Sequence, residues 1–146
     1  MTDVFDAATR SRTMAAVKGR DTSPELRLRK AMHAMGLRHR LQARSLPGRP
    51  DLVYPRFRAA VFVHGCFWHR HPGCPRATTP ATRNDYWLPK FARNVARDAR
   101  ALEDLRALGW RTAVVWECAL SVRRAPATAE ALADWLRGEA PALELP

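Results

Sequence analysis

The pattern of apolar and polar residues along the chain predicts four β-strands. Residues 37–42 alternate between the two kinds, as a half-exposed strand does. Residues 51–54 and 58–64 are largely apolar, which predicts two buried strands joined by a short turn as a hairpin. A further apolar run, residues 110–116, predicts the fourth strand.

Apolar residues at helical spacing predict four helices, over about residues 7–19, 23–35, 84–108 and 128–138. Three of the expected helix starts carry an N-cap residue, whose side chain accepts hydrogen bonds from the first backbone N–H groups of the helix. These residues are Ser23, Asn84 or Asp85, and Thr128. Pro89 fits only in a first turn, so the regular part of the third helix is expected to begin nearer residue 88.

The order of these elements predicts an α/β fold. A helix joins strands 59–64 and 110–116, so these strands are expected to be parallel neighbours in a small mixed sheet flanked by helices. A length of 146 residues suits a single domain. Its expected parts are an N-terminal helical arm over about 1–20, a functional loop over about 65–86 and a C-terminal helix over about 128–138.

The charge of the chain points to a polyanionic partner, most simply nucleic acid. There are 25 Lys and Arg against 14 Asp and Glu, which gives a net charge of +11. Residues 1–60 carry 13 basic against 5 acidic residues, whereas residues 130–146 carry one against four. The first two thirds of the chain are therefore expected to build the DNA-binding face. The alternative is a basic surface that is merely solvated.

Several protein classes are disfavoured. No apolar run approaches the ~20 residues of a membrane helix, and the N-terminus lacks the layout of a signal peptide. Three cysteines cannot all pair within the chain, so free thiols or thiolate ligands are expected in place of disulfides. We expect a cytoplasmic protein. We also expect a monomer, because neither a coiled coil nor an apolar patch is evident.

The loop after strand 58–64 holds a candidate zinc site. Cys66, His71 and Cys74 offer three ligands, and Cys118 follows the strand that should lie parallel to 59–64. This geometry would bring all four residues together as a closed, structural zinc site. Two alternatives stay open, that His69 replaces His71 and that the cysteines are free buried thiols.

A hydrolytic metal site is the second candidate. Asp51 heads one strand of the hairpin and His64 ends the other, so Asp51 should lie close to Val63 and His64. A carboxylate together with a backbone carbonyl can bind Mg²⁺. His69 could then take a proton from a water that attacks a phosphate.

Structural roles are alternatives for three of the candidate residues. Asp51 follows Pro50 and could simply cap a turn. Glu25 stands in the first turn of a helix, where the helix dipole favours an acid. Met14 could be a core residue of the first helix.

Aromatic residues in the basic loop are candidates to contact DNA. Phe67 and Trp68 lie between the proposed ligands, where they could insert between base pairs and unstack them, and Trp87 could join them. The remaining tryptophans follow the periodicity of strands and helices and are expected in the core: Trp110, Trp116 and Trp135.

Together these residues resemble the very-short-patch-repair endonucleases, the T:G mismatch nickases of bacteria. The matching residues are 8–11 with Met14, 20–22, 45–51, 64–69, 80–83, Lys90, 94–95, 97–98, 108–111 and 115–120. The match covers about residues 5–138, and several long motifs follow one another in the family's order.

The resemblance implies a role for each matching residue. Asp51 and the backbone carbonyl of Val63 would bind catalytic Mg²⁺, and His69 would be the general base. Glu25 and His64 would assist, and Asp98 would belong to the outer part of the site. Structural zinc would be bound by Cys66, His71, Cys74 and Cys118. Phe67, Trp68 and Trp87 would intercalate from one groove of the DNA, with Met14 approaching from the other side.

The resemblance also implies a restriction-endonuclease-like fold with an altered motif, because the usual acid and Lys of the third strand would fall at Phe62 and His64. Two departures concern the metal sites. Val63 stands where the family is expected to have Thr, and an extra residue lies between His71 and Cys74.

The function that follows from the resemblance is Mg²⁺-dependent nicking of one DNA strand 5′ to the T of a T:G mismatch. Such mismatches arise when 5-methylcytosine deaminates, so a cytosine methyltransferase in the same cell is implied, and a mismatch-repair protein is a candidate partner. The alternatives are a zinc-stabilised mismatch-binding protein without catalysis, a related nuclease with another target, and a structural RNA-binding module.

Overall fold

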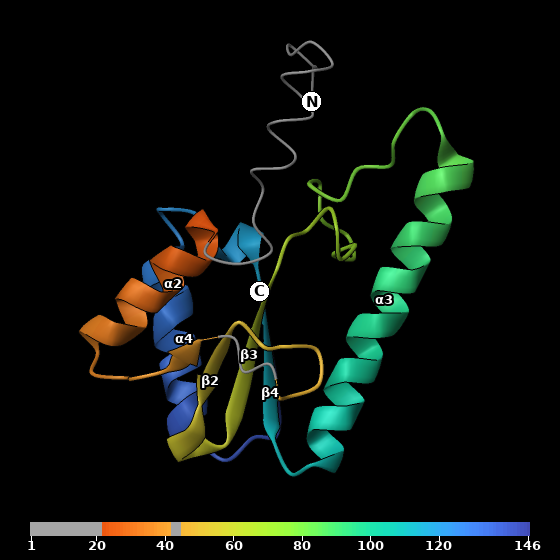
Figure 1. Ribbon diagram of the computed structural model, residues 1–146. Helices are drawn as coiled ribbons and strands as arrows, with labels where there is room; N and C mark the ends of the chain where they lie inside the picture. Colours follow the sequence, from red (N-terminus) through yellow and green to blue (C-terminus); the bar gives the residue numbers. More distant parts are fainter. Residues whose placement is uncertain (1–21, 42–44) are drawn as a thin grey trace.

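The computed structural model describes residues 22–41 and 45–146, in which a five-stranded mixed sheet lies between helices (Figure 1). The helix expected over 7–19, with Met14, lies outside the described residues. The elements are α2 (Ser23–Ala34), β1 (Arg40–Leu41), β2 (Leu52–Tyr54), β3 (Ala59–His64), α3 (Asn84–Ala107), β4 (Arg111–Trp116), α4 (Ala125–Arg137) and β5 (Ala142–Leu145). Two 3₁₀ turns, Pro55–Phe57 and Glu117–Leu120, follow β2 and β4.

The strands are ordered β1-β2-β3-β4-β5 across the sheet. Strands β2 and β3 form the predicted antiparallel hairpin, with Leu52 opposite Val61. Strands β3 and β4 are parallel, as predicted, and His64 lies opposite Trp116. The carboxyl ends of β3 and β4 therefore meet at one edge of the sheet, and the segments that follow them start side by side.

Helices cover both faces of the sheet, with α2 and α4 on one side and α3 on the other (Figure 1). Side chains of β3 alternate between the two layers, as those of a strand must. Val61 packs with the core under α2 and α4, whereas Phe62 packs with Ala101 and Leu105 of α3. The larger core is the one under α2 and α4, and it contains Leu28, Leu132 and Trp135.

The starts of α2 and α4 differ from the predicted ones. Helix α2 begins at Ser23 with Thr22 as its N-cap, so the predicted Ser23 cap was wrong by one residue. Helix α4 begins at Ala125, three residues before the predicted start, because Pro126 is well suited to a first turn. Thr128 is therefore inside the helix, where its buried hydroxyl donates a 2.7 Å hydrogen bond to the Ala119 carbonyl.

Helix α3 begins at Asn84, and the cap predicted at Asn84 or Asp85 was wrong, since Arg83 is the N-cap. Pro89 lies inside the helix instead of its first turn. A proline there removes one backbone donor, and the remaining hydrogen bonds of this 24-residue helix maintain it.

No helix within residues 22–41 and 45–146 is long and apolar enough to cross a membrane.

Both edge strands differ from the sequence prediction. Only Arg40 and Leu41 of the strand expected over 37–42 pair with β2, and Gln42 lies outside the described residues. Strand β5 was not predicted, and it pairs in parallel with β4 through Val114 opposite Glu144. Its four residues are too few to give a clear alternating pattern, and pairing with β4 fixes their conformation.

Replacing Leu28 by Ala should lower the free energy of unfolding by about 2–5 kcal/mol, because the side chain is fully buried and would leave a cavity. Leu26 on the same helix is 38% exposed, so Leu26→Ala should cost less than about 1 kcal/mol. Urea denaturation of both variants measures the difference. Equal losses would contradict the orientation of α2 described above.

Candidate active site and metal centre

The loop between β3 and α3, residues 65–83, has no regular secondary structure, as predicted. It is held by hydrogen bonds to its own backbone. The His69 N–H donates to the Gly65 carbonyl at 3.0 Å, and the Arg70 guanidinium donates to the carbonyls of Ala77 (3.2 Å) and Thr78 (2.9 Å). Arg70 thus joins the two halves of the loop.

Four residues at the carboxyl ends of β3 and β4 form a cluster that could hold a metal ion. The ligand atoms of Cys66, His71, Cys74 and Cys118 all lie within 4.8 Å of one another. The His71 Nδ1 lies 3.6 Å from the Sγ of Cys66 and 3.5 Å from the Sγ of Cys118. Such spacings suit ligands arranged around one ion at metal–ligand distances of about 2.0–2.3 Å. The predicted four residues are brought together, and His69 belongs to a different cluster.

Cys66 is buried, and without a bound cation its thiol keeps its proton. Burial, with a further contribution from the Cys118 thiol, raises the pKa of the Cys66 thiol to about 12. A bound cation stabilises the thiolate and reverses this preference. The backbone N–H of Cys66 donates to Glu117 Oε1 at 3.1 Å, so Glu117 fixes the start of the loop. The sequence analysis missed this role, although Glu117 directly precedes Cys118.

A second cluster contains two histidines and a carboxylate. The rings of His64 and His69 are stacked, with centroids 4.0 Å apart and an interplanar angle of 4°. The Nδ1 of His69 lies 2.6 Å from Oδ2 of Asp98, which α3 contributes. If the carboxylate is ionised, Nδ1 carries the proton and Nε2 keeps its lone pair for accepting another one. The structure thus brings together three residues that the sequence analysis named.

The environment of His64 keeps its ring neutral. Burial lowers the pKa of His64 to about 4, and the neighbouring His69 adds to this effect while Asp98 opposes it. A neutral His64 can remain stacked on His69 when His69 becomes charged. The pair therefore avoids the repulsion of two adjacent positive rings.

Two carboxylates meet on the other side of β3. Asp51 Oδ2 accepts a 2.7 Å hydrogen bond from the Val63 N–H, so the expected proximity of Asp51 to Val63 is confirmed. Glu25, only 1% exposed, comes from α2 and hydrogen-bonds to Asp51. Its carboxylate also pairs with Arg29 at 3.4 Å. Glu25 is thus more than a helix-dipole residue.

Burial, opposed by the Val63 N–H, raises the pKa of Asp51 to about 7, and the neighbouring Glu25 contributes to the increase. Two adjacent carboxylates in a desolvated position favour proton or cation binding, since either one reduces their mutual repulsion. Oxygen ligands of this kind are those that Mg²⁺ and Ca²⁺ prefer. The residues could therefore hold a divalent cation.

The three candidate intercalating residues of the described chain form one aromatic cluster. The ring of Phe67 lies 5.0 Å from that of Trp68 and 6.2 Å from that of Trp87, and Trp68 and Trp87 lie 5.9 Å apart. All three are half-buried. The ammonium group of Lys90 lies 5.5 Å from the Trp68 ring. The cluster thus combines a partly exposed apolar surface with a nearby positive charge.

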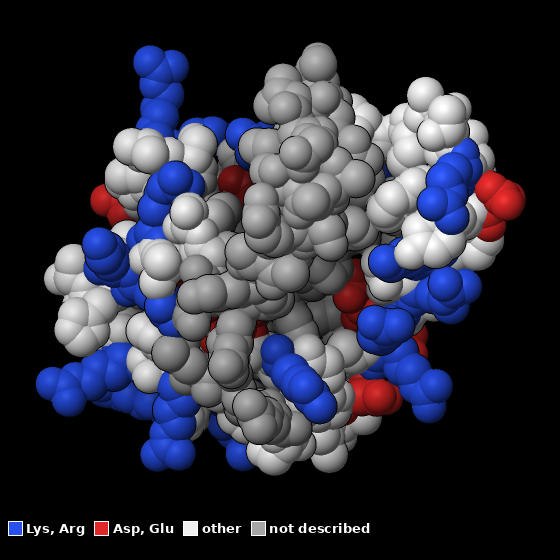
Figure 2. All heavy atoms as spheres, turned by 45° about the horizontal axis from the view of Figure 1, so that its top comes forward, with Lys and Arg blue, Asp and Glu red and all other residues white. Residues whose placement is uncertain are grey.

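Basic side chains surround this edge of the molecule. Figure 2 shows Lys and Arg gathered over α2 on one side and along the first turns of α3 on the other. Between residues 22 and 84 the described chain has only two acids, Glu25 and Asp51, and both belong to the site described above. The electrostatic field around the site therefore attracts a polyanion.

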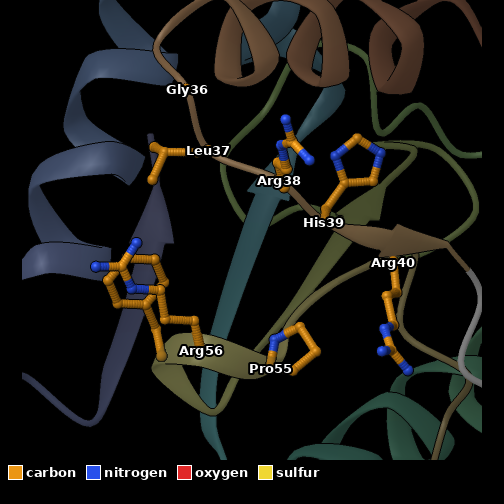
Figure 3. Close-up of a pocket in the computed structure, with 8 residues that line it drawn as sticks. Gly36, Leu37, Arg38, His39, Arg40, Pro55 and Arg56 are labelled. Atoms are coloured by element: carbon orange, nitrogen blue, oxygen red, sulfur yellow. The ribbon is translucent and has the colours of Figure 1, made fainter.

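A hollow of about 390 Å³ lies at the opposite end of the sheet, beside the 3₁₀ turn Pro55–Phe57 and the chain after α2. Its lining includes Arg38, Arg40 and Arg56. Their side chains point in different directions instead of converging on one point (Figure 3). The hollow is therefore not built as a site for a single anion, and it contributes nothing to the clusters above.

Comparisons with known proteins show which family the chain resembles. The family model described as DNA mismatch endonuclease Vsr matches residues 2–75. DNA mismatch endonuclease Vsr from Escherichia coli K12 is 48% identical over 142 residues, which cover 95% of this chain and 90% of that protein.

Two similar proteins carry the name of nicking enzymes. Type II nicking enzyme V.XorIIP from Xanthomonas oryzae pv. oryzae is 48% identical, over 83% of this chain and 88% of its own. Type II nicking enzyme V.NmeAIP from Neisseria meningitidis is 37% identical, and the match covers 82% of this chain and 85% of that protein. These matches confirm the resemblance that the sequence motifs indicated: the chain belongs to the family of the DNA mismatch endonuclease Vsr, a family of DNA endonucleases.

Proposed function

We propose that this protein is a Mg²⁺-dependent endonuclease that nicks one strand of duplex DNA 5′ to the T of a T:G mismatch. The observation that carries the proposal is the arrangement at the end of β3. A carboxylate pair approaches Val63, and the next residue, His64, stacks on a histidine that is oriented by Asp98. Cation ligands and a candidate general base therefore meet at the carboxyl end of β3.

The residues around Asp51 suit Mg²⁺. In an antiparallel pair, the N–H and the carbonyl of one residue face the same neighbouring strand. The Val63 N–H faces Asp51, so the Val63 carbonyl lies on the same side and can join Asp51 as an oxygen ligand. Because the ligand is a backbone atom, Val at this position in place of Thr leaves it unchanged. When bound, Mg²⁺ would stabilise the negative charge that develops on the phosphate.

The histidine pair suits proton transfer. Asp98 holds Nδ1 of His69, which leaves Nε2 to accept a proton from the attacking water. His64 remains neutral and keeps the ring of His69 in place by stacking. Glu25 adds negative charge beside Asp51 and so favours cation binding there.

The Cys/His cluster suits structural zinc. Three thiolates and one imidazole are a common donor set for zinc in closed sites. Cys66 and Cys118 follow two parallel strands, so a metal there would join the functional loop to the sheet. The extra residue between His71 and Cys74 does not separate their ligand atoms.

The basic surface and the aromatic cluster suit DNA with a weakened base pair. Phosphate contacts from Lys and Arg would position the duplex. Phe67, Trp68 and Trp87 would then insert beside the mismatch, with Met14 from the other side. A T:G pair costs less to unstack than a Watson–Crick pair, which would add selectivity to the direct contacts.

The broader setting belongs to the same proposal. The mixed sheet would be a restriction-endonuclease-like core within a single endonuclease domain, acting as a monomer in the cytoplasm. The mismatches would come from deaminated 5-methylcytosine, and a mismatch-repair protein is the candidate partner. A related nuclease with a different target is the second candidate, because similar proteins are named type II nicking enzymes.

His69→Ala should lower the rate of nicking by about 10²–10⁴-fold, as expected when a general base is lost. Asp51→Asn should reduce cleavage similarly, because the cation would lose a charged ligand. Labelled duplexes with T:G or C:G at one position, incubated with and without Mg²⁺, measure both effects. Asp104→Asn is the matched control on α3, since that carboxylate is exposed and pairs only loosely with Arg100 at 3.9 Å.

Two results would contradict this mechanism. Normal nicking by His69→Ala would exclude His69 as the base. Tight binding without a nick by the unsubstituted protein, in any sequence context, would favour the non-catalytic mismatch-binding protein.

Cys118→Ser should remove most of the bound zinc and lower the melting temperature, because the cluster loses the ligand that links the loop to β4. Elemental analysis and thermal denaturation measure the two effects. Ser121→Ala, a few residues further along, is the control that should retain zinc. Full zinc content in Cys118→Ser would show that the fourth ligand is another residue.

Trp68→Ala should weaken binding to a T:G duplex more than binding to a matched duplex, by roughly 1–3 kcal/mol if one stacking contact is lost. Titration of both duplexes measures the ratio of the two dissociation constants. Trp68→Phe keeps an aromatic ring and should restore most of the preference. Equal losses on both duplexes would argue against intercalation.

A further inference from the structure

Trp116 lies between the two clusters of side chains described above. Its ring is stacked on that of His71, with centroids 4.2 Å apart and an interplanar angle of 9°. Its ring also meets the ring of His64 edge-on, at 5.2 Å and 73°. One buried indole therefore contacts a ligand of the Cys/His cluster and the histidine pair at the same time, and it is more than the core residue that its periodicity predicted.

The contact with His64 extends to the candidate base. His64 is stacked on His69 at 4.0 Å, and His69 is held by Asp98. His71, Trp116, His64 and His69 thus form a continuous row of four rings. A displacement of the indole would be passed to His69 through the edge-on contact with His64 and the stacking of His64 on His69, because closely packed rings cannot move independently.

The histidine pair has few other neighbours on one side. A hollow of about 240 Å³ is lined by His64, His69 and Asp98 together with apolar side chains of α3. Rings that border a hollow lack the close packing that usually fixes a buried side chain. Their orientation therefore depends on the few contacts that they have, which are Asp98 beside His69, and Trp116 and Phe62 beside His64.

The C-terminal strand fixes the indole. Oε2 of Glu144 accepts a 2.9 Å hydrogen bond from Nε1 of Trp116, the single polar atom of that side chain. Glu144 lies opposite Val114 in the pairing of β4 with β5, so Trp116 is its diagonal neighbour on the same face of the sheet. The Glu144 side chain also lines the hollow beside the histidines.

We propose that Glu144 is a positioning residue for DNA cleavage, which holds Trp116 so that the indole keeps His64 and His69 in their orientation. This inference rests on the proposed nuclease function, because the base that is oriented is the one proposed for that reaction. It assigns a role to β5, which follows every residue that the family resemblance had marked. Glu144 acts only through Trp116 and does not contact DNA in this assignment.

Glu144→Ala should reduce kcat for nicking of a T:G duplex by about tenfold or more, since small misplacements of a catalytic group cost up to about 10²-fold. KM for the duplex and the melting temperature should stay close to those of the unsubstituted protein. Glu144→Gln should restore kcat to within about twofold, because the amide oxygen accepts the same hydrogen bond. Glu139→Ala, which removes an equal charge from an exposed position before β5, should leave kcat unchanged.

Three outcomes would overturn the proposal. These are an unchanged kcat in Glu144→Ala, an equal loss of kcat in Glu144→Gln, or a change of KM alone. The Gln variant separates the hydrogen bond from the charge, and the split between kcat and KM separates positioning from DNA binding.

A measurement without activity distinguishes failure of this proposal from failure of the nuclease function. The NMR resonances of the His64 and His69 ring protons are shifted by the rings stacked next to them. Glu144→Ala should move these resonances and Glu144→Gln should largely restore them, even if the protein nicks none of the duplexes. Unmoved resonances in Glu144→Ala would overturn the positioning role whatever the activity.

Discussion

The parallel pairing of β3 with β4 is the constraint on which the rest of the site depends. It places His64 opposite Trp116, so the two segments that leave the sheet there start side by side. Cys118, 44 residues after Cys74 in the sequence, thereby reaches the Cys/His cluster. The same pairing sets the indole of Trp116 against His64. A shift of β4 by one residue against β3 would turn the Trp116 side chain to the opposite face of the sheet, away from His64.

The site contains two environments that shift pKa values in opposite directions, and both favour the neutral form of the buried group. On one side of β3, burial and Glu25 raise the pKa of Asp51, and a bound cation would stabilise the two adjacent carboxylates. On the other side, burial lowers the pKa of His64, which keeps a neutral ring beside His69. Both effects come from desolvation at the edge of one strand. The whole chain carries a net charge of +11, which attracts a polyanion. Glu25 and Asp51 oppose that attraction, so their place in the site needs another explanation, such as cation binding.

Much of the candidate site could be predicted because its signals are local. The spacing of Cys66, His71 and Cys74 and the apolar run before them indicate a metal-binding loop after a buried strand, and the cluster of ligand atoms agrees. Helix starts were less predictable. Several residues near each start can serve as a cap, and Pro89 is tolerated inside α3 because a long helix outweighs one lost hydrogen bond.

The sequence by itself determined the family, the order of the main strands and helices, and the residue types of both clusters, because motifs and periodicity are properties of neighbouring residues. Only the tertiary structure decided that Glu25 joins Asp51, that Asp98 orients His69, and that β5 brings Glu144 to Trp116. Each of these contacts joins residues more than 20 positions apart. Their formation depends on how helices and strands pack, which no local pattern of side chains encodes.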